Sequence, residues 1–262
     1  MKSRLQWTRT TLATCLVSIF TIVGPPATGQ ESQSTAEPAT KNAATPEKQS
    51  DTRREFSTPK EDPKLPNVLL IGDSISIAYT LPVRERLSRE ANVWRPAANC
   101  GPTTRGVANL DAWLGDRHWD VIHFNFGLHD LRWMPVKSSA GDDGQSEEAP
   151  QVSLKDYEEN LRKIVTRLKK TGATLIWCET TPVPDKSDHR IQGDEENYNA
   201  VAAKVMQEMG DIRTDDLHDF AKSNAQQLPA NVHYTPAGSE QLADHVTASI
   251  RSALVLHAEA AK

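Results

Sequence analysis

Ser74 is a residue whose type and position point to chemistry, because it follows Gly72 and Asp73 at the end of an apolar run. That run, Val68–Ile71, is mostly branched and predicts a buried parallel strand. Gly72 permits a tight turn, and Asp73 or Ser74 can cap the helix expected next. Free N–H groups and the helix dipole stabilise anions and developing oxyanions at such a position. Ser74 is therefore a candidate for chemistry that builds up negative charge, and the alternative is that it only caps the helix.

Three further segments contain residue types suited to a site. The loop Ala98–Gly106 holds two glycines and a proline, which indicates a tight and specific backbone path. Gly127–Asp130 follows an apolar run and includes His129. Leu228–Tyr234 includes His233 and leads into a helix start with proline at its first position. Polar and small residues are thus concentrated in four separate places along the chain.

The elements between these segments predict how they meet. Strands are expected at 68–71, 91–94, 120–126, 173–178 and 211–214. Helices are expected at 74–89 with a break at Pro82, then at 107–114, 154–170, 197–209, 217–225 and 235–256. This alternation predicts an α/β fold: a three-layer α/β/α sandwich with a mostly parallel, flavodoxin-like sheet of about five strands. Sites in such folds lie at the carboxyl ends of the strands, where all four segments fall.

The N-terminal region predicts export. Residues 1–29 have a basic start, an apolar stretch and small residues for cleavage, as in a secretory signal peptide. An uncleaved anchor is the alternative. Residues 30–64 are polar and have a single aromatic residue, so we expect a disordered linker. The catalytic domain is expected at 65–258, with a polar surface insertion at Lys137–Pro150 that could form a mobile rim of the site.

Composition and residue spacing indicate which partners, disulfides and cofactors to expect. The 262 residues have a net charge of −5 and no basic cluster, so we expect no nucleic-acid partner. Cys100 and Cys178 would follow strands three spacings apart, roughly 14 Å, whereas a disulfide needs Cα atoms within about 7 Å. Two separate buried thiols are expected. No tight metal-ligand spacing is present, so we expect no metal and no cofactor.

The four segments together resemble the GDSL/SGNH hydrolase superfamily, whose members are mostly esterases and lipases. Gly72-Asp73-Ser74-Ile75 matches its first block with Ile for the usual Leu, and the resemblance implies that Ser74 is the nucleophile. The second block implies an oxyanion-hole glycine, with Gly101 as the best match and Gly106 as the fallback. Val232–Gly238 resembles the last block, which implies that His233 is the general base. The resemblance covers about 66–255.

Two departures from the family pattern concern the site directly. The third block usually offers an Asn side chain to the oxyanion, and this chain has His129, with Asp130 able to orient the ring. The acid expected three residues before His233 is replaced by Ala230. A backbone carbonyl, Asn231 or an acid from elsewhere would then have to orient the base, and the sequence leaves these alternatives open.

The resulting functional prediction is a secreted or periplasmic serine esterase. It would hydrolyse short-chain acyl esters such as acetyl esters, on small molecules or carbohydrates, through an acyl-Ser74 intermediate. The Ser74 N–H, the Gly101 N–H and the His129 side chain would stabilise the oxyanion. Asp73, Asp130 and Asn231 are expected to support the site. The alternatives are a non-catalytic carbohydrate-binding relative and an acyltransferase of the same fold. No membrane span is expected after signal cleavage.

Overall fold

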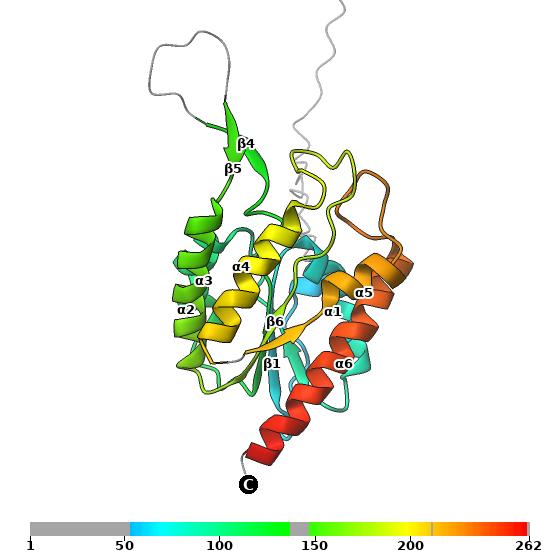
Figure 1. The fold of residues 1–262 in the computed structure, drawn as a ribbon. Coiled ribbons are helices and arrows are strands. Elements are labelled where there is room, and N and C mark those ends of the chain that lie inside the picture. The colour runs from blue at the N-terminus through cyan, green and yellow to red at the C-terminus, as the bar shows by residue number, and fades with distance from the viewer. Residues whose placement is uncertain (1–52, 137–146, 211, 261–262) are drawn as a thin grey trace, which may run out of the picture. The chain divides into compact units, whose positions relative to one another are not determined.

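A parallel five-stranded sheet forms the centre of the fold (Figure 1). The computed structural model describes residues 53–136, 147–210 and 212–260, so the predicted signal peptide and most of the predicted linker lie outside the described residues. The strand order is β2-β1-β3-β6-β7, and every neighbouring pair is parallel. The strands are β1 Asn67–Ile71, β2 Asn92–Trp94, β3 Val121–Phe124, β6 Thr174–Cys178 and β7 Arg213–Asp215. The predicted flavodoxin-like order is confirmed.

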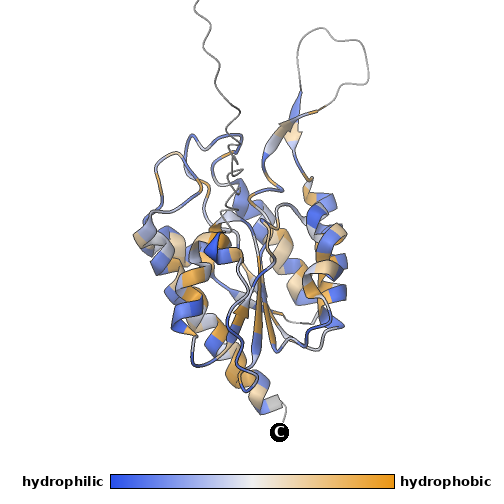
Figure 2. Cartoon of the chain, turned by 180° about the vertical axis from the view of Figure 1, so that it is seen from behind, coloured by the Kyte–Doolittle hydropathy of each residue, from blue (hydrophilic) through white to orange (hydrophobic). Residues whose placement is uncertain are grey.

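Helices cover both faces of this sheet and complete the predicted three layers (Figure 1). On one face lie α1 Ser74–Arg86, α5 Leu217–Asn224 and α6 Pro236–Ala260. On the other lie α2 Thr103–Leu114, α3 Leu154–Lys169 and α4 Asp194–Glu208. Apolar residues concentrate on the strands and on the helix faces turned toward them (Figure 2). In the part of the chain described, no helix is long and apolar enough to cross a membrane.

Helix α1 does not break at Pro82, which corrects the sequence prediction. The helix runs without interruption from Ser74 to Arg86 and contains Pro82 in its interior. Proline removes one backbone donor, so the carbonyl of Ala78 loses its helical partner. Ala78 is exposed, and water can satisfy that carbonyl. The cost of the proline is thereby reduced, and α1 ends only after the last turn at Arg86.

The domain begins earlier than predicted. The prediction of disorder through residue 64 is wrong for 53–64, which contain the short 3₁₀ helix η1 Arg54–Phe56 and several contacts with the domain. The Asp62 N–H donates to Asn92 Oδ1 at 2.8 Å, and Glu61 pairs with Arg117 at 2.7 Å. The ring of Phe56 lies 5.5 Å from the Arg95 guanidinium. These specific partners order a segment whose composition alone predicts disorder.

Part of the predicted surface insertion forms a hairpin that composition did not indicate. Its strands are β4 Trp133–Pro135 and β5 Glu148–Pro150, which pair antiparallel. Residues 137–146 between them lie outside the described residues. The predicted mobile rim falls on these residues, so it stays a prediction. Cys100 and Cys178 are both buried and free, as predicted.

Candidate active site

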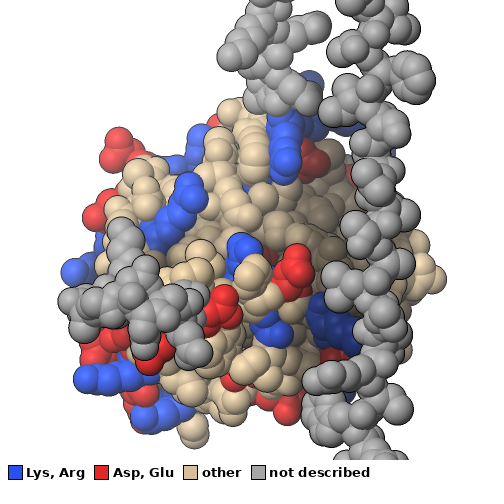
Figure 3. Space-filling view, turned by 90° about the horizontal axis from the view of Figure 1, so that it is seen from above, with Lys and Arg blue, Asp and Glu red and all other residues tan. Residues whose placement is uncertain are grey.

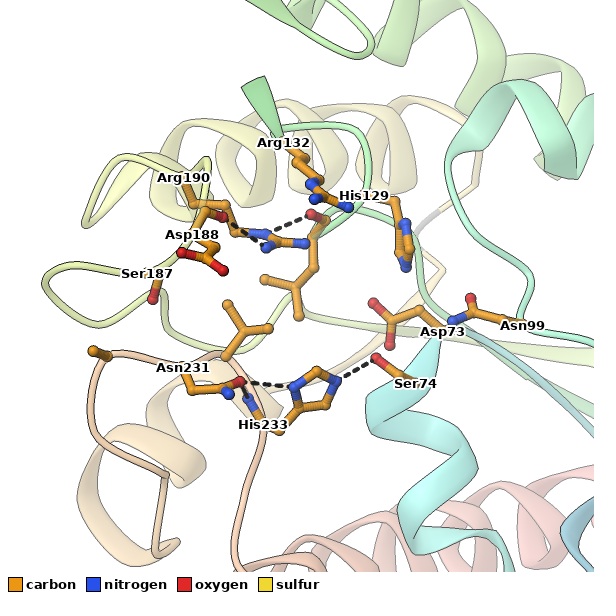
Figure 4. Close-up of a pocket in the computed structure, with 13 residues that line it drawn as sticks. Asp73, Ser74, Asn99, His129, Arg132, Ser187, Asp188, Arg190, Asn231 and His233 are labelled. Carbon is orange, nitrogen blue, oxygen red and sulfur yellow. Dashed lines mark hydrogen bonds between the residues drawn. The ribbon is translucent and has the colours of Figure 1, made fainter. Parts of the chain in front are cut away.

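A cavity of about 400 Å³ opens at the carboxyl ends of the strands, and all four predicted segments contribute to its lining (Figure 4). Its lining includes Ser74 at the start of α1, His129 from the loop after β3, and His233 from the loop before α6. Asn99 represents the fourth segment. Figure 3 shows this end of the molecule from above, with acidic and basic side chains interspersed around its centre. The cavity volume is in the usual range for small-molecule sites, about 300–1,000 Å³.

Ser74 and His233 are in direct contact. The His233 Nε2 lies 2.9 Å from the Ser74 Oγ, although the residues are 159 positions apart in sequence. Asp73 is the cap of α1, and its Oδ1 accepts a hydrogen bond from the Ile75 N–H at 2.9 Å. Ser74 is therefore not the helix cap, and its hydroxyl is left to face the imidazole. A serine and a histidine in this relation form the nucleophile and base of acyl-transfer enzymes.

Asn231 orients the His233 ring, which resolves the alternatives that the sequence left open. The Asn231 Oδ1 lies 2.7 Å from His233 Nδ1 and also accepts the backbone N–H of His233 at 3.0 Å. A backbone N–H can only donate, so the Asn231 atom at this point is the oxygen. Nδ1 must then carry the ring proton, and Nε2 presents a lone pair to the Ser74 hydroxyl. This is the tautomer that a general base requires.

The His233 loop is held close to the start of α6. Ala230, at the position where the family acid was expected, has a positive φ of 53° and lines the cavity. Thr235 caps α6, because its Oγ1 accepts the Gly238 N–H at 3.0 Å. A Cβ at Gly238 would collide with the backbone of Gln226, so only glycine fits there. The loop and the helix are thus packed against each other with no room for a side chain between them.

Of the two predicted backbone donors to the oxyanion, the Ser74 N–H is free and the Gly101 N–H is already bonded among the residues described. The Ser74 N–H is in the first turn of α1, where helical amides lack intrahelical partners, and it has no acceptor among the residues described. The Gly101 N–H donates to Asn99 Oδ1 at 2.9 Å, and Gly101 has a positive φ of 62°. Asn99 lines the cavity, and Figure 4 shows its side chain directed toward Asp73 and Ser74. The Asn99 amide is therefore a candidate donor that the sequence analysis missed, while a direct role for Gly101 stays a prediction.

His129 lies in the cavity wall, but Asp130 does not orient it. The Asp130 Oδ1 accepts the backbone N–H of Thr103 at 2.8 Å and the Thr103 hydroxyl at 2.5 Å, so the carboxylate holds the start of α2. Burial raises the pKa of Asp130 to about 7. Burial also lowers the pKa of His129; the charge of Asp73 opposes this shift, and the charges of Arg190 and Arg132 add to it. His129 is accordingly neutral at pH 7 and can donate one ring N–H.

Arg95 supports the Ser74 turn from the protein interior. Its Nη1 donates to the hydroxyls of Ser76 and Thr80, at 3.2 and 2.8 Å, and its Nη2 to the carbonyl of Gly72 at 3.3 Å. The side chain is buried, so these bonds form away from bulk water. Arg95 positions the turn without lining the cavity. No pattern in the sequence indicates this role, since Arg95 merely follows the strand β2 and precedes a proline.

Metal-ligand residue types cluster elsewhere in the described part of the chain. The two groups are His123, Cys178 and Asp215, and Asp215, Asp216 and His245. None of these residues lines the cavity with Ser74. Although burial favours the neutral form, hydrogen bonds from His123 and His245 hold the pKa of Asp215 below its usual range. Asp215 Oδ2 lies 2.8 Å from His123 Nε2, so the carboxylate already has a hydrogen-bond partner inside the protein.

Comparison with known families agrees with the geometry. The profile of the GDSL-like lipase/acylhydrolase family matches residues 70–241, which include Ser74, His129 and His233. The chain belongs to this family. No curated protein sequence matches the chain.

Solved structures share the fold of this GDSL-like hydrolase. An acetyl xylan esterase, AlAXEase, is 17% identical with a TM-score of 0.54, covering 70% of this chain and 99% of its own. The lipase/acylhydrolase from Enterococcus faecalis is 17% identical with a TM-score of 0.56, covering 72% and 96%. TesA is 16% identical with a TM-score of 0.55, covering 71% and 99%. At these identities the comparison shows the shared three-layer fold.

Proposed function

We propose that this GDSL-like hydrolase is an exported serine esterase that cleaves short-chain acyl esters through an acyl-Ser74 intermediate. The observation that carries the proposal is the 2.9 Å contact between Ser74 Oγ and His233 Nε2, with Nδ1 held by Asn231. A serine hydroxyl is a weak nucleophile at neutral pH and needs a base to take its proton during attack. The contact supplies that base in the required tautomer.

The reaction follows from this arrangement. Ser74 Oγ attacks the ester carbonyl carbon while its proton passes to His233 Nε2. The carbonyl oxygen becomes an oxyanion. When the tetrahedral intermediate collapses, the bond to the alcohol breaks, and the alcohol leaves with the proton from His233. A water molecule then attacks the acyl carbon while its proton passes to His233 Nε2. The bond from the acyl carbon to Ser74 Oγ breaks, the carboxylic acid leaves, and Ser74 takes the proton back.

The oxyanion would meet donors from three loops. The Ser74 N–H at the start of α1, the Asn99 side-chain amide and the neutral His129 ring are the candidates that line the cavity. Removing one such donor typically lowers kcat about 10²–10³-fold. The Gly101 N–H would act by holding Asn99 Oδ1, or directly if Asn99 moves aside.

Substrate size and cellular location complete the proposal. A cavity of about 400 Å³ accommodates a sugar-sized alcohol with a small acyl group better than a long acyl chain. One structural relative is named an acetyl xylan esterase, which agrees with acetyl esters of carbohydrates as the substrate class. Residues 1–29 would direct the chain out of the cytoplasm.

The test uses the full-length chain and its Ser74→Ala variant. A fluorophosphonate probe should label the wild type and not the variant. Hydrolysis should be fastest for acetyl esters and should fall steadily through butyryl and octanoyl esters. Absence of both labelling and turnover would favour a carbohydrate-binding role. Transfer of the acetyl group to an added sugar, in preference to water, would favour an acyltransferase.

A further inference from the structure

Two arginines share the cavity with the Ser74–His233 pair. Arg132 precedes β4, and Arg190 lies in the loop between β6 and α4; both line the cavity. Their positions are tied together, because the N–H of Trp133 donates to the carbonyl of His189 at 2.7 Å. Figure 4 shows the two guanidinium groups on the opposite side of the cavity from Ser74 and His233. The cavity therefore has a nucleophilic side and a cationic side.

Arg190 is fixed by backbone carbonyls and not by a carboxylate. Its Nε donates to the Leu128 carbonyl at 2.9 Å and its Nη1 to the Asp188 carbonyl at 3.1 Å. These bonds set the direction of the guanidinium without neutralising its charge. In the ranges that the structure describes, Nη2 has no acceptor, and no carboxylate oxygen lies within 4 Å of the Arg190 nitrogens.

Arg132 is also incompletely satisfied. Its Nε is buried and has no hydrogen-bond partner among the described residues. Buried polar groups normally have partners, so the described residues do not saturate the guanidinium of Arg132, which lines the cavity. Burial, followed by the charge of Arg132, lowers the pKa of Arg190. The two guanidinium groups thus repel one another, and an anion between them would relieve that repulsion.

The carboxylates in the same cavity limit how much negative charge it accepts. Asp73 and Asp188 both line it. Asp73 Oδ1 is already bonded to the N–H of Ile75, and Asp188 is exposed. Water screens the charge of the exposed Asp188, whereas Asp73 is buried. Two cations and one unscreened anion leave an excess of about one positive charge, which favours a single negative charge over a double one. A planar carboxylate also matches the fork of a guanidinium.

We propose that the natural ester carries a carboxylate, which Arg132 and Arg190 bind while its ester carbonyl lies at Ser74. This inference rests on the proposed esterase function and adds the charge of the substrate to it. An acylated sugar acid has the required chemistry, with the carboxylate in the alcohol part. A half-ester of a dicarboxylic acid would place the carboxylate in the acyl part.

The experiment compares matched esters that differ by one charge. The acetyl ester of methyl glucuronoside is paired with the acetyl ester of its uncharged amide. The hemiglutarate of methyl glucoside is paired with its methyl ester, and acetylated glucose 6-phosphate tests a dianion. We expect kcat/KM to be at least tenfold higher for one carboxylate ester than for its neutral partner. The pair that shows the preference identifies which part of the substrate carries the charge.

Variants then assign the preference to the two arginines. Arg132→Gln and Arg190→Gln should each lower the charged-to-neutral ratio of kcat/KM about tenfold, mainly through KM. Lys186→Gln is the matched control, because Lys186 is an exposed cation of the same loop that does not line the cavity. It should leave the ratio unchanged. Equal rates on charged and neutral esters, a preference for the phosphate, or equal ratios in all variants would overturn the inference.

A binding measurement separates this inference from the esterase proposal. Calorimetry with full-length Ser74→Ala should show methyl glucuronoside or free glutarate binding at least tenfold more tightly than methyl glucoside. Arg190→Gln in the same background should remove the difference. If the carboxylates bind selectively but the wild type hydrolyses none of the esters, the esterase proposal is wrong and the anion site is supported. If the wild type hydrolyses neutral esters but the carboxylates do not bind selectively, the esterase proposal is supported and the anion site is wrong.

Discussion

Asn231 and His233 are joined by two hydrogen bonds to one oxygen, since the Asn231 Oδ1 accepts both the ring Nδ1–H and the backbone N–H of His233. The His233 ring is thereby fixed by a neutral amide two residues away instead of a carboxylate three residues away. Such an acceptor selects the tautomer as well as an acid does. It stabilises the imidazolium of the transition state less, because it carries no charge.

Replacing Asn231 should separate orientation from charge. Asn231→Ala removes the acceptor for Nδ1, and a hydrogen bond to a charged group contributes about 1.5–3 kcal/mol. We expect kcat to fall about 10–100-fold with little change in KM. Asn231→Asp keeps both hydrogen bonds and adds a negative charge. Its acidic limb in the kcat/KM–pH profile should move to higher pH. Wild-type kcat in the alanine variant would remove Asn231 from the site.

Asn99→Ala should show which group donates to the oxyanion. The substitution removes the side-chain amide from the cavity and releases the Gly101 N–H from its bond to Asn99. If the Asn99 amide is the donor, kcat falls about 100-fold at nearly constant KM. We expect this result because Asn99 lines the cavity and Gly101 does not. An increase in kcat would instead assign the role to the released Gly101 amide.

His129 should be replaceable by asparagine better than by alanine. The neutral ring offers one N–H as a donor. An Asn side chain, which the GDSL/SGNH pattern usually has at this position, offers an amide donor instead. His129→Ala should lower kcat about 100-fold or more, and His129→Asn less than tenfold. Steady-state kinetics on an acetyl ester measure both. A fall in kcat with a comparable rise in KM, and no recovery in His129→Asn, would instead indicate that His129 has a packing role.

Asp130→Asn should stabilise the protein at alkaline pH. The pKa of Asp130 is raised to about 7 in the folded state, against roughly 4 when unfolded. Between these values the folded protein keeps a proton that the unfolded chain releases, so wild-type stability falls as pH rises through this window. The variant keeps an oxygen for Thr103 and does not titrate. Urea denaturation should show a gain of about 2–4 kcal/mol at pH 8 and almost none at pH 4.

The matched control for that measurement is Asp116→Asn, at an exposed aspartate. Its effect on the free energy of unfolding should be small and independent of pH. A difference between Asp130→Asn and wild type that stays constant from pH 4 to pH 8 would contradict the raised pKa of Asp130.

Sequence reasoning located the strands of the parallel sheet, the turn at Ser74 and the loop of His233, because each has a local signal. The apolar run before Gly72 and the proline after Thr235 mark element boundaries whatever the rest of the chain does. Contacts between distant residues have no such signal. Asp130 was paired with its neighbour His129, whereas it bonds Thr103 across the fold. Arg95 and Asn99 reach the site only in the folded arrangement of the loops, and the ring of Phe56 lies against the Arg95 guanidinium.

The close packing of Gly238 on the backbone of Gln226 has a consequence for how this enzyme can adapt. The segment that bears His233 cannot shift without carrying the first turn of α6 with it. Accommodation of a larger or differently shaped alcohol is thus left to the opposite rim, where Ser187, Asp188 and Arg190 lie on a separate loop. The rim with His233 would keep the geometry of the reaction constant, and the loop with Arg190 would determine which substrate is bound.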